Sequence, residues 1–398
     1  MREAARQAAA GVSDRAGAAG DGAVVGIIAN PVSARDIRRV VANAGSLQLA
    51  DRANIVLRAL AALGACDVRQ VLMMPDHEGL RVMLTRHLAR ARAADGSDRR
   101  WPRLGWLEMP VTGRVDDSFR AARLLREAGA AAIIVLGGDG THRAVVRECG
   151  RVPIAGISTG TNNAYPEMRE ATTAGLAVGL YASGRIPAAR ALAWNKRLDV
   201  ALNAGRDDAR SDIALVDVAI ARERYIGARA LWKTDSLAAV YLSFAEPDAL
   251  GLSSIGGLLD PVGRHEPGGL CVELSPSGVP GAEAARAAGA GGPDAAGVPR
   301  FDLRAPIVPG LIETVPVHAW RRLSDGEPVR VRQREGVVAL DGEREITFGP
   351  DDVLTVTLRE RAFRSVDVGA CLRHAAEHGL LRRAHGDSPP ISPTASVS

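Results

Sequence analysis

An apolar run that stops at three closely spaced glycines constrains this chain more than any other feature. Residues 131–141 read Ala-Ala-Ile-Ile-Val-Leu-Gly-Gly-Asp-Gly-Thr. The run Ile133–Leu136 predicts a buried strand, and the helical spacing of Thr141, Val145 and Val146 predicts a helix directly after the turn. A strand, a turn nearly without side chains and a helix N-terminus form a place where anions bind backbone N–H groups.

The three glycines of this turn, Gly137, Gly138 and Gly140, surround one acid, Asp139. Glycine allows positive φ and lets a phosphate approach the main chain closely. Because a carboxylate repels phosphate, we expect Asp139 either to hold Mg²⁺ or to take a proton from an attacking hydroxyl. The pattern is neither a Walker A motif nor G-x-G-x-x-G, so an ordinary strand-to-helix turn is the alternative interpretation.

The bulk composition excludes several classes of protein. A chain of 398 residues with 46% apolar residues predicts two domains with sizeable cores, and its net charge of +4 is too small to indicate nucleic-acid binding. Four widely spaced cysteines without C-x-x-C predict buried thiols in a reducing compartment. Neither a signal peptide nor a membrane-length apolar run is evident, so we expect a cytoplasmic protein that does not contact membranes.

Strand-like and helix-like segments alternate through the first half of the chain. This alternation predicts a Rossmann-like parallel sheet with helices on both faces, and ligands then bind beyond the carboxyl ends of the strands. Asn30, Asp139 and Asn162 all follow predicted strands, so they are expected to converge on one crevice.

The second half changes its period. The alternating segment Asp212–Ala221 and the strand-like segments Val329–Arg334, Val337–Leu340 and Val353–Leu358 predict an antiparallel β-rich sandwich. The predicted organisation is a tail at 1–22, an α/β domain at 23–188, a β-rich domain at 189–365 with a low-complexity insertion at 279–300, a helix at 366–383 that packs on the first domain, and a tail at 384–398.

Several motifs carry a resemblance to a known superfamily. Gly137–Thr141 resembles the signature that unites NAD kinases with diacylglycerol and sphingosine kinases. Residues 305–311 are similar to the Pro-Ile-x-Pro segment of NAD kinases, and residues 340–343 with 350–353 to their late Asp-Gly-Gln turn. Residues 30–39 and 159–163 most resemble the branch of ATP-NAD kinase-like proteins that includes acetoin-catabolism protein X.

The resemblance implies an enzyme, a substrate pair and a set of site residues. ATP with Mg²⁺ would phosphorylate the 2′-hydroxyl of NAD to give NADP, Asp139 would be catalytic, and small-molecule nucleotides would be the partners of a homo-oligomer. The residues implied to bind phosphate or nucleotide are Asn30, Pro31, Gly137, Gly138, Gly140, Thr141 and His142; those implied to bind the acceptor or ribose are Thr159, Gly160, Thr161, Asn162, Asn163 and Asp217; Asp341 and Glu343 are implied to support Mg²⁺.

Each of these residues also has a purely structural interpretation. Thr141, Asn162 and Asn163 are residue types that cap helices, and Asp341 with Gly342 is typical of a β-turn. His142 can lie outside the site, and we expect its ring to be neutral because a cation at a helix N-terminus is unfavourable.

Two departures from the family pattern leave the acceptor open. Val216 and Asp217 occupy positions where NAD kinases carry an asparagine-glutamate pair that contacts the dinucleotide, and Asn163 replaces an acid of the lipid kinases. A lipid or small-polyol kinase, and a non-catalytic nucleotide-binding accessory protein of acetoin catabolism, are therefore alternatives. The donor can be ATP or polyphosphate.

Overall fold

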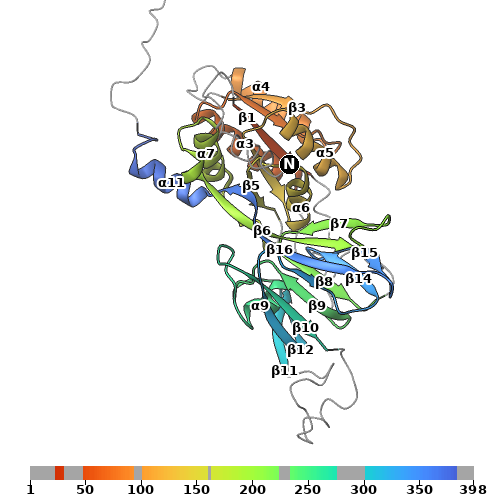
Figure 1. Cartoon of the computed structure of the whole chain (residues 1–398). Helices are drawn as coiled ribbons and strands as arrows, with labels where there is room; N and C mark the ends of the chain where they lie inside the picture. The colour runs from red at the N-terminus through yellow and green to blue at the C-terminus, as the bar shows by residue number, and fades with distance from the viewer. Residues whose placement is uncertain are drawn as a thin grey trace, which may run out of the picture.

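The computed structural model describes residues 23–30, 48–93, 101–159, 163–223, 234–275 and 301–382. Two layers of structure follow one another in Figure 1, an α/β layer and a β-rich layer, joined by long strands that run between them. The helices are α3 (Leu49–Ala65), α4 (Leu80–Ala93), α5 (Asp116–Glu127), α6 (Asp139–Glu148), α7 (Ala171–Ala182), α8 (Ala188–Ala191), α9 (Ser253–Gly257) and α11 (Val368–Glu377).

The strands form two sheets. The first sheet contains β1 (Val24–Ala29), β2 (Gln70–Met73), β3 (Arg103–Trp106), β4 (Ala132–Gly137), β5 (Ile154–Ser158), β6 (Leu192–Leu202), β7 (Arg210–Ala214), β13 (Pro328–Arg330) and β16 (Leu354–Val366). The second contains β8 (Asp217–Ala221), β9 (Leu237–Leu242), β10 (Gly269–Leu274), β11 (Phe301–Val308), β12 (Leu311–Leu323), β14 (Gly336–Leu340) and β15 (Glu343–Phe348).

The parallel part of the first sheet has the order β3-β2-β1-β4-β5. Its central strands β1 and β4 are apolar along nearly their whole length, as expected for parallel strands buried on both faces. One core on one face joins these strands to α3, α4, α7 and α11, and another on the opposite face joins them to α5 and α6. The predicted fold class, an α/β parallel sheet followed by an antiparallel β-rich domain, is confirmed.

Close helix packing on one face depends on two glycines of α7. A Cβ at Gly175 would lie 2.8 Å from the Cβ of Ala62, and one at Gly179 would lie 2.6 Å from the Cβ of Cys66. Larger residues would therefore force α7 away from α3. On the same side, α11 contacts α7 and α8, and Cys371 and Ala375 of α11 belong to this core (Figure 1).

The first sheet does not end with its parallel strands. β16 lies beside β5 and pairs antiparallel with β6, and β6 pairs antiparallel with β7. Four strands from the second half of the chain, β6, β7, β13 and β16, therefore extend the sheet of the first half. A core that includes Val200, Val356, Ile220 and Val338 fills the space between this extension and the second sheet.

The alternating segment Asp212–Ala221 is two strands rather than one. β7 belongs to the first sheet and β8 to the second, so the chain crosses between sheets at Leu215 and Val216. The carboxylate of Asp341 accepts hydrogen bonds from the N–H groups of Leu215 at 3.0 Å and Val216 at 2.8 Å. The N–H groups of Leu215 and Val216 cannot pair with a neighbouring strand where the chain crosses between the sheets. The side chain of Asp341, distant in sequence, provides their hydrogen-bond acceptor instead.

Within the described ranges, no helix is both long and apolar enough to span a membrane. The predicted tails at 1–22 and 384–398 and the insertion at 279–300 lie outside the described residues.

Candidate active site

Three strands of the first sheet end beside one another at the predicted crevice. Ala29 of β1 pairs with Leu136 of β4, and Gly137 of β4 pairs with Ser158 of β5. The order of strands reverses at β1, which has β2 on one side and β4 on the other. Such a switch point is where open α/β sheets bind ligands, and Asn30 and the glycine turn both lie there.

The glycines of the turn are required by close packing rather than by φ. None of Gly137, Gly138 and Gly140 has a positive φ, which corrects one part of the expectation. A Cβ at Gly137 would lie 2.5 Å from the Cβ of Thr141, and one at Gly138 would lie 2.6 Å from Oδ1 of Asn163. Thr141 and Asn163 can therefore pack this closely on the turn only because Gly137 and Gly138 lack side chains.

Asp139 holds the chain segment that follows β5. Its Oδ1 accepts the N–H of Tyr165 at 2.8 Å, and its Oδ2 accepts the N–H of Ala164 at 3.0 Å. The carbonyl groups of the same two residues accept hydrogen bonds from Arg264, at 2.8 Å for Ala164 and 2.7 Å for Tyr165. Residues 164–165 are thus clamped between an acid of α6 and an arginine from the loop before β10.

The asparagines predicted to bind nucleotide contact neighbouring loops. The Nδ2 of Asn163 donates to Oγ of Ser158 at 2.9 Å, beside Gly138. The Nδ2 of Asn30 donates to the carbonyl of Arg114 and to Oγ of Ser118, both at 3.0 Å, so this side chain fixes the loop before α5.

Of the other residues predicted to bind ligand in these loops, some are described by the structure and some are not. The N–H of Thr159 contacts the carbonyl of Gly137 at 3.4 Å, and Thr141 is buried. Pro31, Gly160, Thr161 and Asn162 lie outside the described residues, so their roles stay predictions.

His142 lies in the core. Its side chain is fully buried, its Nδ1 is 2.9 Å from the carbonyl oxygen of Gly138, and its ring packs on that of Tyr165. Burial lowers the pKa of His142 to about 4, so the expected neutral state is confirmed. The expected phosphate contact of this ring is corrected, because the imidazole packs against Gly156 beneath the turn and is not at a surface that a phosphate could reach.

A buried arginine that the sequence did not single out connects α6 to the second sheet. The guanidinium of Arg143 lies 3.0 Å from Glu345, 3.6 Å from Asp212 and 4.0 Å from both Asp341 and Glu343, measured between the nearest nitrogen and oxygen atoms. Four acids from two strands and a turn therefore surround one cation that lies one helical turn from Asp139.

Asp341 is the most buried acid of this cluster. Loss of water raises the pKa of its carboxyl to about 6; Arg143 opposes the rise, and the charge of Asp139 adds to it. Asp139 and Asp341 are therefore close enough to influence each other. Asp341 and Gly342 both have positive φ and connect β14 to β15, which confirms the β-turn interpretation.

The other predicted acids lie around Asp341. Its N–H donates to the carbonyl of Asp217 at 2.9 Å, and the Asp217 side chain is 7% exposed. Glu343 is 34% exposed, and its Oε1 would lie 3.3 Å from a Cβ at Gly140. Because the oxygens of Asp341 already accept backbone N–H groups, Glu343 is the more accessible of the two acids predicted to support Mg²⁺.

The two arginines were missed for different reasons. Arg143 follows Asp139 by four residues, which places both on one face of α6, but lysine and arginine together make up 50 of the 398 residues, so the position of one arginine carries little information. Arg264 belongs to a loop, and nothing in its local sequence indicates contact with residues about one hundred positions earlier.

Comparisons with known proteins agree with this architecture. Residues 25–186 match the ATP-NAD kinase N-terminal domain, and residues 196–361 match the acetoin catabolism protein X C-terminal domain. Acetoin catabolism protein X of Cupriavidus necator is 66% identical over 359 residues, which cover 90% of this chain and 94% of that protein.

Similar solved structures are distant. Yeast NADH kinase complexed with NADH is 13% identical with a TM-score of 0.42, covering 94% of this chain and 91% of that chain. A candidate diacylglycerol kinase from Bacillus anthracis str. Sterne is 11% identical with a TM-score of 0.44, covering 86% of this chain and 97% of that one. These scores are too low to support an argument about function. On the sequence matches, the chain belongs to the acetoin catabolism protein X family and carries an N-terminal domain of the ATP-NAD kinase type.

Proposed function

We propose that this protein is an ATP-dependent phosphotransferase of the NAD kinase type that converts NAD to NADP. The observation that carries the proposal is the position of Asp139, an acid in the first turn of α6, within a glycine turn at the switch point of the sheet. The match of residues 25–186 to the ATP-NAD kinase domain supports the same reaction class.

In the proposed reaction, the bond between the γ-phosphorus and the β–γ bridging oxygen of ATP breaks, and a bond from that phosphorus to the 2′-oxygen of NAD forms. The proton of the 2′-hydroxyl passes to the carboxylate of Asp139, and ADP leaves. Each oxygen of Asp139 accepts one backbone N–H group, from Ala164 and Tyr165, and a carboxylate oxygen can accept more than one hydrogen bond. The N–H groups at the start of α6 would bind phosphate oxygens.

Mg²⁺ fits the chemistry of this region because it prefers carboxylate oxygens. The partly exposed carboxylate of Glu343, beside Gly140, would hold the ion, which supplies charge neutralisation for the phosphates when bound.

The test measures NADP formed from ATP, Mg²⁺ and NAD with an NADP-specific dehydrogenase. Because Asp139 also holds residues 164–165, Asp139→Asn is paired with Arg264→Gln, which removes the other half of the same clamp. If Asp139 takes the proton, Asp139→Asn lowers kcat by roughly a hundredfold or more, the usual contribution of a general base. Arg264→Gln is expected to raise KM mainly.

Equal losses of kcat in the two variants would show that Asp139 only positions the loop. Circular dichroism and the unfolding midpoint of each variant check that the fold is retained. Wild-type protein that binds ATP but forms no NADP would contradict the NAD kinase proposal. Parallel assays then test the alternative activities. Polyphosphate replaces ATP as the donor in one assay, and lipid micelles or polyols replace NAD as the acceptor in the others.

A second candidate is a nucleotide-binding accessory protein without turnover. It is favoured by the two backbone hydrogen bonds that occupy Asp139, by Val216 in place of an asparagine, and by a close relative named for acetoin catabolism. It predicts tight binding of ATP or NAD(H) in calorimetry with no ADP or NADP produced. Multiple turnovers with any acceptor would exclude it.

A further inference from the structure

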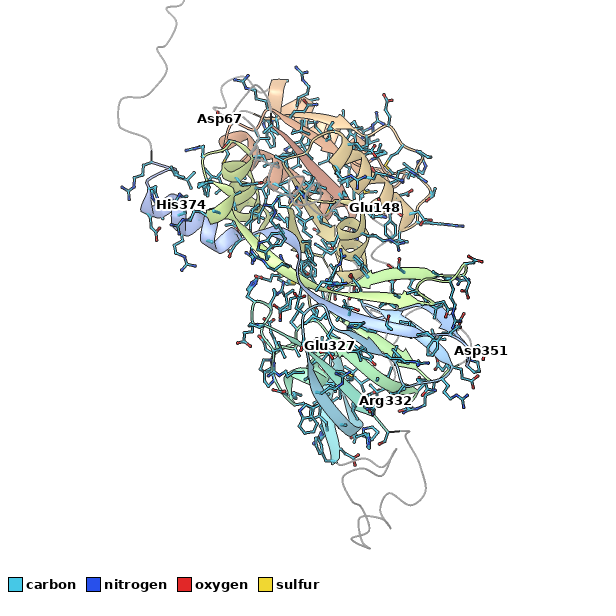
Figure 2. The ribbon with its side chains drawn as sticks, in the orientation of Figure 1. Asp67, Glu148, Glu327, Arg332, Asp351 and His374 are labelled. Atoms are coloured by element: carbon cyan, nitrogen blue, oxygen red, sulfur yellow. The ribbon has the colours of Figure 1, made fainter. Side chains whose placement is uncertain are left out.

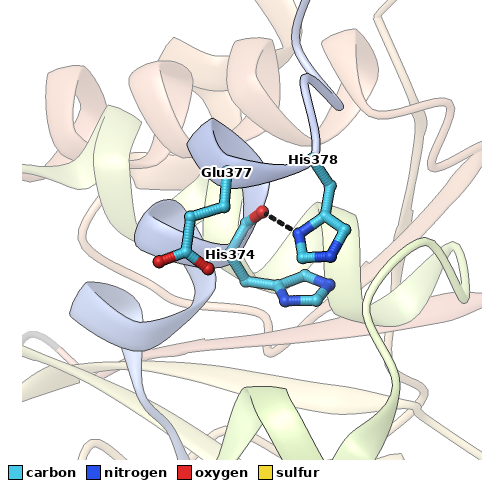
Figure 3. A group of neighbouring side chains, drawn as sticks. All are labelled: His374, Glu377 and His378. Atoms are coloured by element: carbon cyan, nitrogen blue, oxygen red, sulfur yellow. Dashed lines mark hydrogen bonds between the residues drawn. The ribbon is translucent and has the colours of Figure 1, made fainter.

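A second group of potential ligands lies on the C-terminal helix. His374, Glu377 and His378 are spaced i, i+3 and i+4, and this spacing places their side chains on one face of α11 (Figure 3). One ligand atom from each side chain lies within 4.8 Å of the others. Figure 2 shows His374 at the outer side of α11, remote from the junction of the two layers where α6 lies.

The ring of His378 is held in the form that binds metals. Its Nδ1 lies 2.9 Å from the main-chain carbonyl oxygen of His374, as the dashed line in Figure 3 shows. A carbonyl oxygen can only accept, so Nδ1 carries the hydrogen and Nε2 of the neutral ring carries the lone pair. Metal-ligating histidines commonly have their other ring nitrogen fixed in this way.

The surroundings of the group also favour a cation. His374 lies in the last turn of α11, and His378 is the C-cap residue. The last carbonyl groups of a helix C-terminus carry partial negative charge, which stabilises a cation there. His378 and Glu377 are exposed and His374 is half-buried, so an ion can enter and the side chains can adjust.

We propose that His374, Glu377 and His378 bind a divalent transition metal of the zinc type. A set of two imidazole nitrogens and one carboxylate oxygen suits Zn²⁺, whereas Mg²⁺ prefers oxygen ligands alone. The two rings are stacked with centroids 4.0 Å apart, so binding requires the His374 ring to rotate until its nitrogen faces the ion beside Nε2 of His378. The bound ion would connect the last turn of α11 to its C-cap and stabilise the helix end.

The test is a calorimetric titration of the full chain, without an affinity tag, with Zn²⁺ in buffer free of Mg²⁺. The variants are His378→Ala and the double variant His374→Ala/His378→Ala. The control is His77→Ala, which removes an exposed histidine whose ring contacts the carbonyl of Val111. Loss of an outer-shell partner alone usually weakens metal binding by roughly tenfold or more, so loss of a ligand is expected to weaken it further.

Wild-type protein and His77→Ala are expected to bind one Zn²⁺ with equal affinity, and the unfolding midpoint of both should rise with Zn²⁺. The double variant should lose the binding isotherm, and Zn²⁺ should leave its unfolding midpoint at the value that the same variant has without metal. Zn²⁺ binding that is unchanged in the double variant, or absent from the wild type, would overturn the proposal. Neither result depends on kinase activity.

Discussion

At the scale of single residues, Gly138 and Gly140 of the glycine turn differ in what an added side chain would meet. A Cβ at Gly138 would lie 2.6 Å from Oδ1 of Asn163, whose amide is held by Ser158. A Cβ at Gly140 would lie 3.3 Å from Oε1 of Glu343, the far end of a flexible side chain. Gly140 also lies inside α6, where alanine favours the helix.

Replacement of the two glycines by alanine should therefore have opposite effects on the free energy of unfolding. Gly138→Ala forces Asn163 to move and is expected to cost about 1–3 kcal/mol, the usual range for overpacking. Gly140→Ala is expected to leave the free energy unchanged or raise it by up to ~1 kcal/mol. Urea denaturation of both variants measures the difference. Equal destabilisation would show that the contact with Asn163 is not what excludes a side chain at 138.

His142 gives a pH dependence whose sign can be derived. Its pKa falls from 6.5 in the unfolded chain to about 4 in the fold, so between these values the unfolded chain binds more protons. The contribution to stability is fully present above pH 6.5 and is lost as the pH falls through about 4. The shift corresponds to at most about 3 kcal/mol. Asp341, whose pKa is raised to about 6, acts in the opposite direction over a similar range.

The variant His142→Leu isolates the histidine from Asp341. At pH 7 it should be less stable than the wild type by roughly 1 kcal/mol, because the hydrogen bond to Gly138 is lost. At pH 4.5 this deficit should vanish or reverse, since leucine takes up no proton. Denaturation curves for both proteins at the two pH values provide the measurement. A deficit that is the same at both values would mean that His142 does not titrate as described.

At the scale of elements, α6 carries both the glycine turn and the main electrostatic connection to the second sheet. Arg143 is buried among Asp212, Asp341, Glu343 and Glu345. Arg147, one turn later, is exposed, pairs with Asp212 and lies over the ring of Phe119. The two arginines therefore offer a matched pair with different burial on one helix.

Arg143→Met is expected to cost about 3–5 kcal/mol, because it leaves buried carboxylates without their cation. Arg147→Met should cost about 1 kcal/mol or less, as surface ion pairs do. Guanidinium chloride would screen the ion pairs, so urea is the suitable denaturant. If both variants lose the same small amount, the cluster around Arg143 does not connect the two layers energetically.

The observed strands and helices show which elements could be predicted from the sequence and which could not. The strand predicted at Ile133–Leu136 and the helix predicted directly after the glycine turn correspond to β4 and α6, because an apolar run and a glycine turn are local signals. The segment Val353–Leu358 was predicted as a short strand, yet β16 continues to Val366. Charged residues at 359–361 hid the continuation, and the register with β6 shifts at that point.

The candidate site was predictable only in its local parts. The residues of the turn could be identified from their spacing, and β5 could be placed next to them by the alternation of strands and helices. The contacts of Arg143 with Glu345 and of Arg264 with Ala164 join residues 202 and 100 positions apart, respectively. Such pairs depend on how the second sheet packs on the first, which no local pattern in one sequence determines.

At the scale of the whole molecule, the first sheet is assembled from both ends of the chain. β16 lies between β5 and β6, and α11 directly follows it and covers the same side as α3 and α7 (Figure 1). The matched family domains divide the chain near residue 190, but the sheet and its core cross that division. The two halves therefore form one structural unit, because strands from the second half of the sequence complete the first sheet.

This arrangement has a consequence for the order of events during synthesis on the ribosome. When residues up to β5 have emerged, the edge of β5 that β16 will cover is still unpaired, and the core beneath α7 still lacks α11. An unpaired strand edge is prone to pair with other chains. This edge of β5 therefore stays uncovered until the last strand, β16, is translated, and the interval in which the nascent chain can pair wrongly spans most of its synthesis.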